Sequence, residues 1–136
     1  MVRYLNLKSR ERSEMIDITE RIEEMIDNLR VASGCCDLFV MHTTAGLTVN
    51  EGADPAVKRD IISFLDRAVP HNSPYFTHAE GNAAAHVKAS IMGSSLRLFI
   101  DKGKLLLGTW QAVYFCEFDG PRDRKVAIRI VTEPSV

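Results

Sequence analysis

Apolar residues recur at two different spacings along the chain, and the spacing changes from one segment to the next. Between Ile22 and Leu29 the apolar positions lie three or four residues apart, which is typical of one face of an α-helix. In residues 35–41 the apolar run is nearly continuous, which is typical of a strand covered on both faces. Residues 2–7 and 15–18 have shorter extended patterns. The front half of the chain is therefore predicted to mix strands with helices.

Capping residues predict the ends of the first two helices. Thr19 is expected to cap the first helix, and Gly34 fits its C-terminal stop. Asp54 followed by Pro55 is a strong start signal for a second helix, because Asp accepts from free backbone amides and Pro suits the first turn. Pro70 is expected to end that helix.

A third helix is predicted from Asn82 to about Met92, with Gly93 closing it. Its expected buried stripe consists of Ala84, Val87 and Ile91. His86 lies on the opposite stripe, four residues after Asn82, and is therefore available for a polar site.

The last third of the chain is predicted to be strands. Residues 96–101 and 105–107 flank a Lys-Gly-Lys turn and form a hairpin pattern, and strands follow at 110–118 and 125–131. Mixed elements in front and a run of strands behind favour an α+β fold with a largely antiparallel sheet. A length of 136 residues suits one domain over residues 1–136.

Composition and charge narrow the function classes. Apolar residues make up 46% and charged residues 26%, close to the average for globular proteins. A net charge of −1 lacks the positive excess that drives phosphate-backbone binding, so no nucleic-acid partner is expected. No apolar run is long enough to span a bilayer, so no membrane partner is expected. The polar N-terminus and three cysteines, expected to be reduced and mostly buried, predict a cytoplasmic protein.

Polar residues gather first around the segment that follows the apolar run 35–41. His42 ends that strand, where a histidine is either a hydrogen-bonded core residue or a ligand. Asn50 and Glu51 lie just before Asp54, so they belong either to a site or to the chemistry of helix entry. Neither alternative is excluded by the spacing.

Three further segments carry candidate chemistry. His78 and His86 lack the spacing of a helical zinc motif, so a loop would have to fold back to bring them together. Glu117 shares a strand face with Val113 and Phe115, and it is expected either to point into a polar site or to form an ion pair at the strand end. Arg122, together with Arg124, suits either solvated turn charges or an anion clamp.

Four ordered motifs make the chain resemble the YjbQ family over nearly its whole length. The motifs are His42-Thr43-Thr44-Ala45-Gly46-Leu47 with Asn50-Glu51 and Asp54-Pro55, Glu80-Gly81-Asn82 with Ala85-His86-Val87-Lys88, Gly103 with Leu107-Gly108-Thr109-Trp110-Gln111, and Glu117 with Asp119-Gly120-Pro121-Arg122. The resemblance implies a compact domain with β-sheets in a sandwich, flanking helices and assembly into a homotrimer. It also implies thiamine-phosphate-synthase activity, thought to be secondary in the family, which joins a pyrimidine pyrophosphate to a thiazole phosphate.

On this resemblance, the polar motif residues are expected to form one site. The candidate catalytic residues are Asn50, Glu51, Asp54, Gln111 and Glu117. The candidate substrate-binding residues are Thr44, Asn82, Lys88, Trp110 and Arg122, of which Lys88 and Arg122 are expected to bind phosphate groups and not to act in folding.

The three motif histidines, His42, His78 and His86, are predicted to hold a divalent metal, zinc by the nature of their nitrogen ligands. His71, in a Pro-flanked loop, is expected to be exposed. Two other functions fit the same residues. One is a metal-dependent hydrolase of a phosphorylated metabolite with Glu51 or Glu117 as base. The other is a protein that binds a metabolite or metal without turnover.

Overall fold

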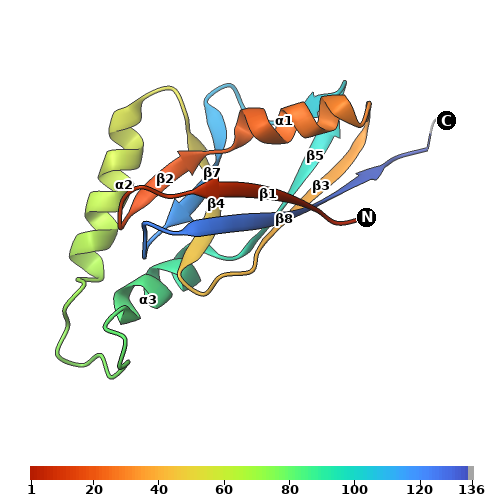
Figure 1. The fold of residues 1–136 in the computed structure, drawn as a ribbon. Helices are drawn as coiled ribbons and strands as arrows, with labels where there is room; N and C mark the ends of the chain where they lie inside the picture. Colours follow the sequence, from red (N-terminus) through yellow and green to blue (C-terminus); the bar gives the residue numbers. More distant parts are fainter. Residues whose placement is uncertain (135–136) are drawn as a thin grey trace.

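The structure is a computed structural model that describes residues 1–134 (Figure 1). Eleven helices and strands follow one another within those residues. They are β1 Arg3–Lys8, β2 Glu14–Asp17, α1 Thr19–Asn28, β3 Gly34–Val40, β4 Ala45–Glu51, α2 Pro55–Ala68, α3 Ala83–Met92, β5 Ser95–Asp101, β6 Lys104–Leu105, β7 Gln111–Glu117 and β8 Asp123–Thr132.

The strands form two antiparallel sheets. The larger sheet has the order β1-β8-β3-β5-β6, and the smaller has the order β2-β7-β4. In the smaller sheet Ala45 pairs with Glu117 and Glu51 pairs with Gln111, so β4 and β7 run side by side over their full length. The predicted α+β fold with sheets in a sandwich and flanking helices is confirmed.

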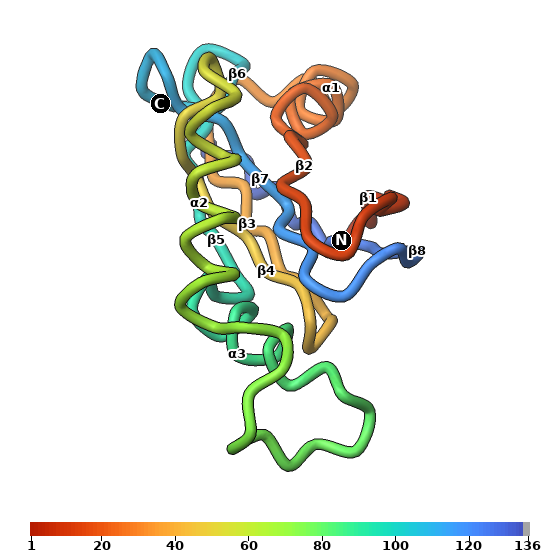
Figure 2. The backbone as a smooth tube through the Cα atoms, turned by 90° about the vertical axis from the view of Figure 1, so that its left-hand side faces the viewer, coloured from red at the N-terminus to blue at the C-terminus, as the bar shows by residue number. Residues whose placement is uncertain are grey.

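Period-two alternation in β7 divides the core into two parts. Val113 and Phe115 point between the two sheets, where they pack with the inner face of the large sheet and with Ile22 and Ile26 of α1. Tyr114 and Cys116 point the other way, toward α2 and α3. The fold therefore has three layers, which are the helices α2 and α3, the small sheet and the large sheet. Figure 2 shows α2 and α3 on the same side of the molecule, joined by the loop 69–82.

The first helix differs from the prediction at both ends. Ile18, not Thr19, holds the N-cap position, and Thr19 Oγ1 instead accepts a hydrogen bond of 2.8 Å from the amide of Val113. The helix ends at Asn28, and Arg30 follows in the left-handed region with φ of 55°. Gly34 is instead the first residue of β3. A Cβ at this position would lie 1.9 Å from the carbonyl oxygen of Val131, so only glycine fits here. That glycine serves strand packing and does not stop the helix.

The buried face of α3 also differs from the prediction. Val87 and Ile91 are exposed, whereas Ala85, Lys88 and Ala89 are buried. The helix is turned because it packs closely on β4, where a Cβ on Gly46 would lie 2.7 Å from the carbonyl oxygen of Gly93. The predicted caps of the other two helices are confirmed, with Asp54 accepting from the amide of Ala56 at 2.9 Å and Gly93 in the C-cap position.

Within residues 1–134 no helix covers the outer face of the large sheet. Its exposed side chains form adjacent rows along β1, β3, β5 and β8, and the large apolar ones among them are Tyr4, Phe39, Phe99 and Val131. We call this surface the open sheet face. No helix within residues 1–134 is long and apolar enough to cross a membrane.

Candidate functional site

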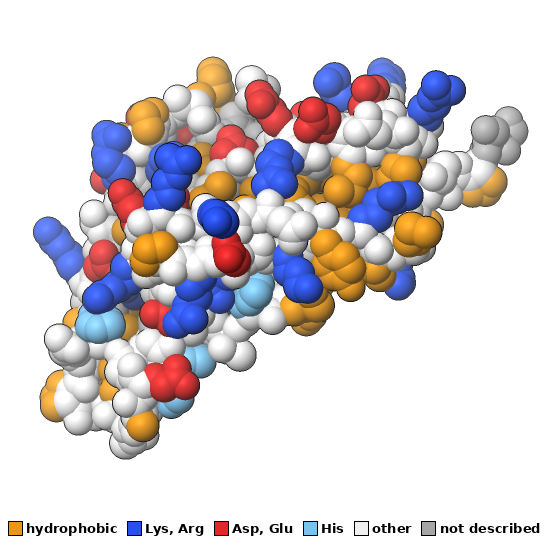
Figure 3. Space-filling view, viewed as in Figure 1, with side chains coloured by type: hydrophobic (Ala, Val, Ile, Leu, Met, Phe, Trp, Pro, Cys, Tyr) orange, Lys and Arg blue, Asp and Glu red, His pale blue; other side chains and the backbone are white. Residues whose placement is uncertain are grey.

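A pocket of about 380 Å³ lies where the start of β4, the start of α3 and the β7–β8 turn come together. We call it the histidine pocket. It is lined by Met41, His42, Thr43, Thr44, His78, Glu80, Asn82, His86, Asp119, Arg122 and Arg124. Figure 3 shows the histidine side chains in the lower half of this face of the molecule, with lysine, arginine and acidic side chains beside them.

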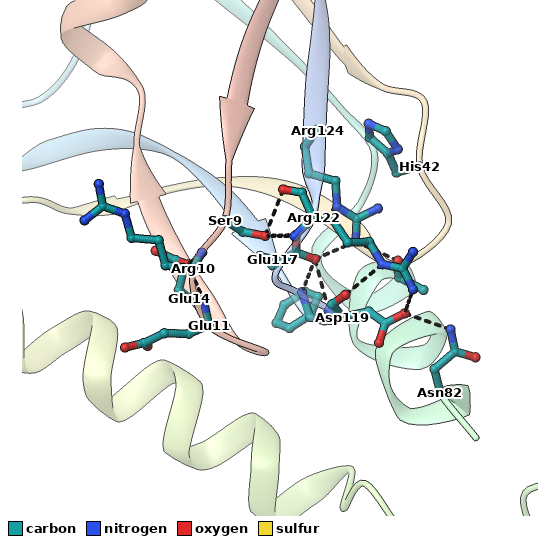
Figure 4. Close-up of polar contacts among 12 residues, drawn as sticks. Ser9, Arg10, Glu11, Glu14, His42, Asn82, Glu117, Asp119, Arg122 and Arg124 are labelled. Atoms are coloured by element: carbon teal, nitrogen blue, oxygen red, sulfur yellow. Dashed lines mark hydrogen bonds and ion pairs between the residues drawn. The ribbon is translucent and has the colours of Figure 1, made fainter. Parts of the chain in front are cut away.

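The base of the histidine pocket is a buried ion pair between the two sheets (Figure 4). Glu117 is fully buried at the end of β7 and Arg124 is nearly so at the start of β8. The guanidinium donates through Nε to Glu117 Oε1 at 2.8 Å, and its Nη2 donates to Glu117 Oε2 and to Thr44 Oγ1. Ser9 Oγ donates to the same carboxylate at 2.6 Å. Of the two alternatives for Glu117, the strand-end ion pair is the observed one.

The Glu117 carboxylate is not placed to act as a base. Burial raises the pKa of this carboxyl, but hydrogen bonds from Arg124, Ser9 and the amide of Asp119 outweigh burial and hold the pKa below its ordinary value. Glu117 therefore stays ionised at neutral pH with its oxygens occupied. Its function in this geometry is to fix Arg124 beneath the pocket.

A second charged pair forms the rim. Arg122 Nη2 donates to Asp119 Oδ2 at 2.9 Å, and Arg122 Nε donates to the Asp119 carbonyl at 2.8 Å. Burial raises the pKa of the Asp119 carboxyl, but hydrogen bonds from Asn82 and Arg122 hold it below its ordinary value. The side chain of Arg122 is half-exposed. It therefore keeps free N–H groups that a ligand can reach, because a guanidinium has five.

Asn82 has one satisfied group and one unsatisfied group. Its Nδ2 donates to Asp119 Oδ2 at 2.8 Å, which fixes which end of the amide faces Asp119. Its Oδ1 is buried and accepts no hydrogen bond within residues 1–134. A buried acceptor without a donor is destabilising by about 1–3 kcal/mol. A ligand that offers an N–H or O–H at this position would remove that cost.

His42 is held in one protonation state. Its Nε2 accepts from the amide of Lys125 at 3.1 Å, so the ring proton lies on Nδ1. Burial and the positive charge of Arg124 lower the pKa of His42. At neutral pH His42 is therefore a neutral ring with an Nδ1–H donor.

The three predicted metal ligands line the same pocket, but as placed they do not fit a three-histidine zinc site. His78 and His86 lie edge to face with ring centroids 5.1 Å apart. A metal on Nδ1 of His42 would put the ring proton on Nε2, where the Lys125 amide already donates. Within residues 1–134 no three His, Cys, Asp or Glu side chains are grouped to hold a metal.

Five of the predicted site residues lie at the opposite end of the small sheet. Gln111 and Glu117 lie six positions apart along β7, which is about 20 Å of extended strand. The five are Asn50, Glu51, Asp54, Trp110 and Gln111. One chain therefore does not bring the predicted residues into a single site.

Local turns occupy the polar groups at that end. The Glu51 carboxylate accepts from the amide of Ala53 at 2.9 Å, and Asp54 caps α2. Gln111 Oε1 accepts from the amide of Gly108 at 2.8 Å. Trp110 is exposed. The helix-entry interpretation of Asn50, Glu51 and Asp54 matches these contacts.

Lys88 is also outside the histidine pocket. It is only 5% exposed and forms an ion pair with Asp66 of α2. The expectation that Lys88 acts in anion binding and not in folding is therefore wrong in its second part, because the pair joins α3 to α2. His71 is exposed, as predicted.

Ser9 and Asp119 were not among the predicted site residues, and the partner of Glu117 was not identified. The signal for Arg124 is present in the sequence, since period-two alternation puts it on the same buried face as Val126 and Ile128. A buried cation on one strand and a buried carboxylate on another are expected to pair. Ser9 carries no comparable signal.

The cysteines have no part in the site. All three are free, and burial raises the pKa of Cys36 and of Cys116 to about 12. These two thiols stay protonated at neutral pH and are not nucleophiles. The prediction of free, mostly buried cysteines is confirmed.

The fold and this pocket define a small antiparallel sandwich with a polar, cation-lined pocket at one end. Residues 3–133 match the family model described as UPF0047 protein YjbQ-like. The chain is 44% identical to the UPF0047 protein YugU of Bacillus subtilis, covering 96% of this chain and 99% of that protein. It is 49% identical to a UPF0047 protein of Methanocaldococcus jannaschii, covering 92% and 90%.

Solved structures of similar proteins have the same fold as this chain. A YjbQ/UPF0047-family protein of Clostridium acetobutylicum superposes with a TM-score of 0.91 at 49% identity, covering 94% of this chain and 98% of that one. A protein of Aeropyrum pernix has a TM-score of 0.91 at 33% identity, covering 98% and 99%. The chain belongs to the YjbQ/UPF0047 family.

Proposed function

We propose that the histidine pocket binds the phosphate or diphosphate group of a small molecule. The observation that carries this proposal is the arrangement of donors: the free guanidinium N–H groups of Arg122 on the rim, the Nδ1–H of neutral His42, and Arg124 fixed beneath them. A guanidinium matches phosphate oxygens in bidentate fashion. Asn82 Oδ1, which has no partner within residues 1–134, would accept a hydrogen bond from a ligand that carries an amine, hydroxyl or ring N–H near its phosphate.

The reaction we propose is a transfer of the thiamine-phosphate-synthase type. The ring nitrogen of a thiazole phosphate attacks the carbon that bears the diphosphate of a pyrimidine pyrophosphate. The new C–N bond forms, the C–O bond breaks, and inorganic diphosphate leaves with the electron pair. Arg122 and His42 would stabilise the charge that develops on the diphosphate, which lowers the barrier because the donors are already oriented.

A homotrimer would account for two features that one chain leaves unexplained. The open sheet face exposes aromatic and aliphatic side chains that a second copy can cover. A ring of three joins two different patches at each contact, so opposite ends of one chain can meet across it. In that arrangement Glu51, Gln111 and Trp110 of one subunit can still act with the histidine pocket of another. Sedimentation at micromolar concentration tests the assembly, and a single species near 15.2 kDa would contradict it.

The hydrolase alternative is less well supported by this geometry. Glu117 has its oxygens occupied by Arg124 and Ser9, and Glu51 lies at the far end of β4. Neither carboxylate is free beside the histidine pocket of its own chain. A binding protein without turnover remains the second alternative, and turnover above the uncatalysed rate would exclude it.

Product analysis tests the proposed reaction. Purified protein is incubated with a pyrimidine pyrophosphate and a thiazole phosphate, and the products are identified by mass spectrometry. We expect a coupled product and diphosphate in equal amounts, lost in Arg122→Ala. Release of phosphate without the second organic substrate would indicate the hydrolase instead. No product above background would leave the binding protein.

A further inference from the structure

A second pocket, of about 340 Å³, lies on the other side of α3 from the histidine pocket. We call it the lysine pocket. Lys88 follows His86 by two residues, which is about 200° around a helix, so the two side chains leave opposite faces of α3. The lysine pocket is formed where α3 approaches α2 and the β1–β2 loop, and its charged and ionisable residues are Arg12, Asp66, His71 and Lys88.

Lys88 is unusual because its charge is buried without being fully satisfied. An ammonium has three N–H donors, and within residues 1–134 the Nζ of Lys88 makes one hydrogen bond, to Asp66 Oδ1 at 2.5 Å. The Asp66 side chain is itself 54% exposed, so it shares its charge with solvent. A buried cation is costly unless it is paired and hydrogen-bonded. The two remaining donors of Lys88 therefore favour an anionic oxygen in the lysine pocket.

The charge balance of the pocket points the same way. Arg12 and Lys88 contribute two positive charges against the single carboxylate of Asp66. Arg12 is exposed and has no ion pair within residues 1–134. The guanidinium of Arg12 is therefore free to donate hydrogen bonds to a phosphate that also accepts from Lys88.

We propose that the lysine pocket is a second anion site that takes a phosphate monoester, separate from the histidine pocket across α3. This site stands on its own geometry and does not depend on the function proposed for the histidine pocket. Because α3 lies between the two pockets, molecules bound in them would not meet, and the lysine pocket is not the second substrate site of the proposed transfer.

Amide NMR of the full chain, titrated with inorganic phosphate at low salt, tests the site. We expect the amide signals of residues 12–13, 66, 71, 84–85 and 88 to shift with saturation. Arg12→Gln should weaken this binding about threefold to tenfold, because it removes a charged donor that forms no ion pair within residues 1–134. The matched control is Arg21→Gln, which removes an exposed arginine of α1 and should leave the phosphate affinity unchanged.

Two further variants separate an anion site from a purely structural ion pair. Lys88→Met keeps the length of the side chain and should abolish the phosphate shifts near α2. Asp66→Asn removes the competing carboxylate, so phosphate should bind more tightly and should raise Tm more than in the wild type. A structural pair alone would lower Tm in both variants with no difference in their response to phosphate, and that result would overturn the proposal.

The two proposals fail separately. Shifts confined to the histidine pocket and lost in Arg122→Ala would overturn the lysine pocket alone. Shifts confined to the lysine pocket would overturn the proposed function of the histidine pocket alone. Phosphate shifts of equal size in wild type and Arg12→Gln would show nonspecific binding and would also overturn the second site.

Discussion

The two ends of the β4–β7 pair carry the same kinds of residue in different settings. At the β7 C-terminal end, Glu117 is fully buried and bonded to the side chains of Ser9 and Arg124, which lie in two other segments of the chain. At the other end, Glu51 is partly exposed and accepts from an amide two residues away. A carboxylate satisfied by its own turn needs no other partner, whereas one satisfied across two sheets holds a pocket together. This difference identifies the Glu117 end of the strand pair, and not the Glu51 end, as the candidate functional site.

The largest expected effect is on stability. Glu117→Gln should lower the free energy of unfolding by about 3–5 kcal/mol, because it leaves the charge of Arg124 buried without its partner. Urea denaturation at pH 7 measures this change. Glu51→Gln is the matched control at the other end of the strands, and it should cost less than about 1 kcal/mol because its partner is an exposed amide. Equal losses in the two variants would remove the distinction between the ends.

The stability of the protein in acid should depend on the Glu117 end of the strand pair. The pKa of Glu117 and that of Asp119 are lowered in the folded state, so their contribution is complete above the unfolded value of about 4 and is lost as pH falls through the lower folded values. We expect the urea midpoint of the wild type to fall steeply below about pH 4. In Glu117→Gln the fall should be shallower. Parallel curves would show that this pair does not control the acid response.

His42 should titrate late on acidification. Its pKa is lowered by burial and by Arg124, so it stays neutral below the ordinary value of about 6.5. The stability that it contributes is present above that value and is lost as pH falls through the lower folded pKa. Imidazole nitrogen NMR should show the Nδ1–H tautomer at pH 7. An Nε2–H tautomer would contradict the Lys125 hydrogen bond.

Zinc is expected to have the smallest effect. At neutral pH we expect zinc to bind no more tightly to the wild type than to His42→Gln or His86→Ala, because within residues 1–134 the three rings are not grouped to hold a metal and the Nε2 of His42 accepts from Lys125. Elemental analysis of untagged protein and a zinc titration of both variants measure this. Loss of zinc in His42→Gln would show that the predicted three-histidine site forms after His42 gives up its backbone contact.

Local signals in the sequence predicted most of the fold. The Asp54 cap, the Gly93 stop and the alternation in β7 depend on neighbours a few residues away, and each is confirmed. The buried face of α3 was predicted wrongly, because close packing on Gly46 turned small residues and Lys88 inward and left Val87 outside. Hydrophobicity alone does not contain that contact.

The candidate site was predicted less well for the same physical reason. His42, His78, His86, Asn82 and Arg122 do line one pocket. Glu51 and Gln111 do not, because antiparallel pairing of β4 with β7 puts Glu51 beside Gln111 and leaves both at the far end from Glu117. Strand direction decides which motif residues meet, and it is a property of the topology that motif spacing does not show.

The most direct test of the histidine pocket is calorimetric titration with inorganic diphosphate at low salt. We expect saturable binding to the wild type, weakened by about 1.5–3 kcal/mol in Arg122→Ala, which is the range for a hydrogen bond to a charged group. Arg21→Gln, which removes an exposed arginine of α1, should bind diphosphate as the wild type does. Unchanged affinity in Arg122→Ala, with both variants folded, would contradict the assignment of the histidine pocket as the anion site.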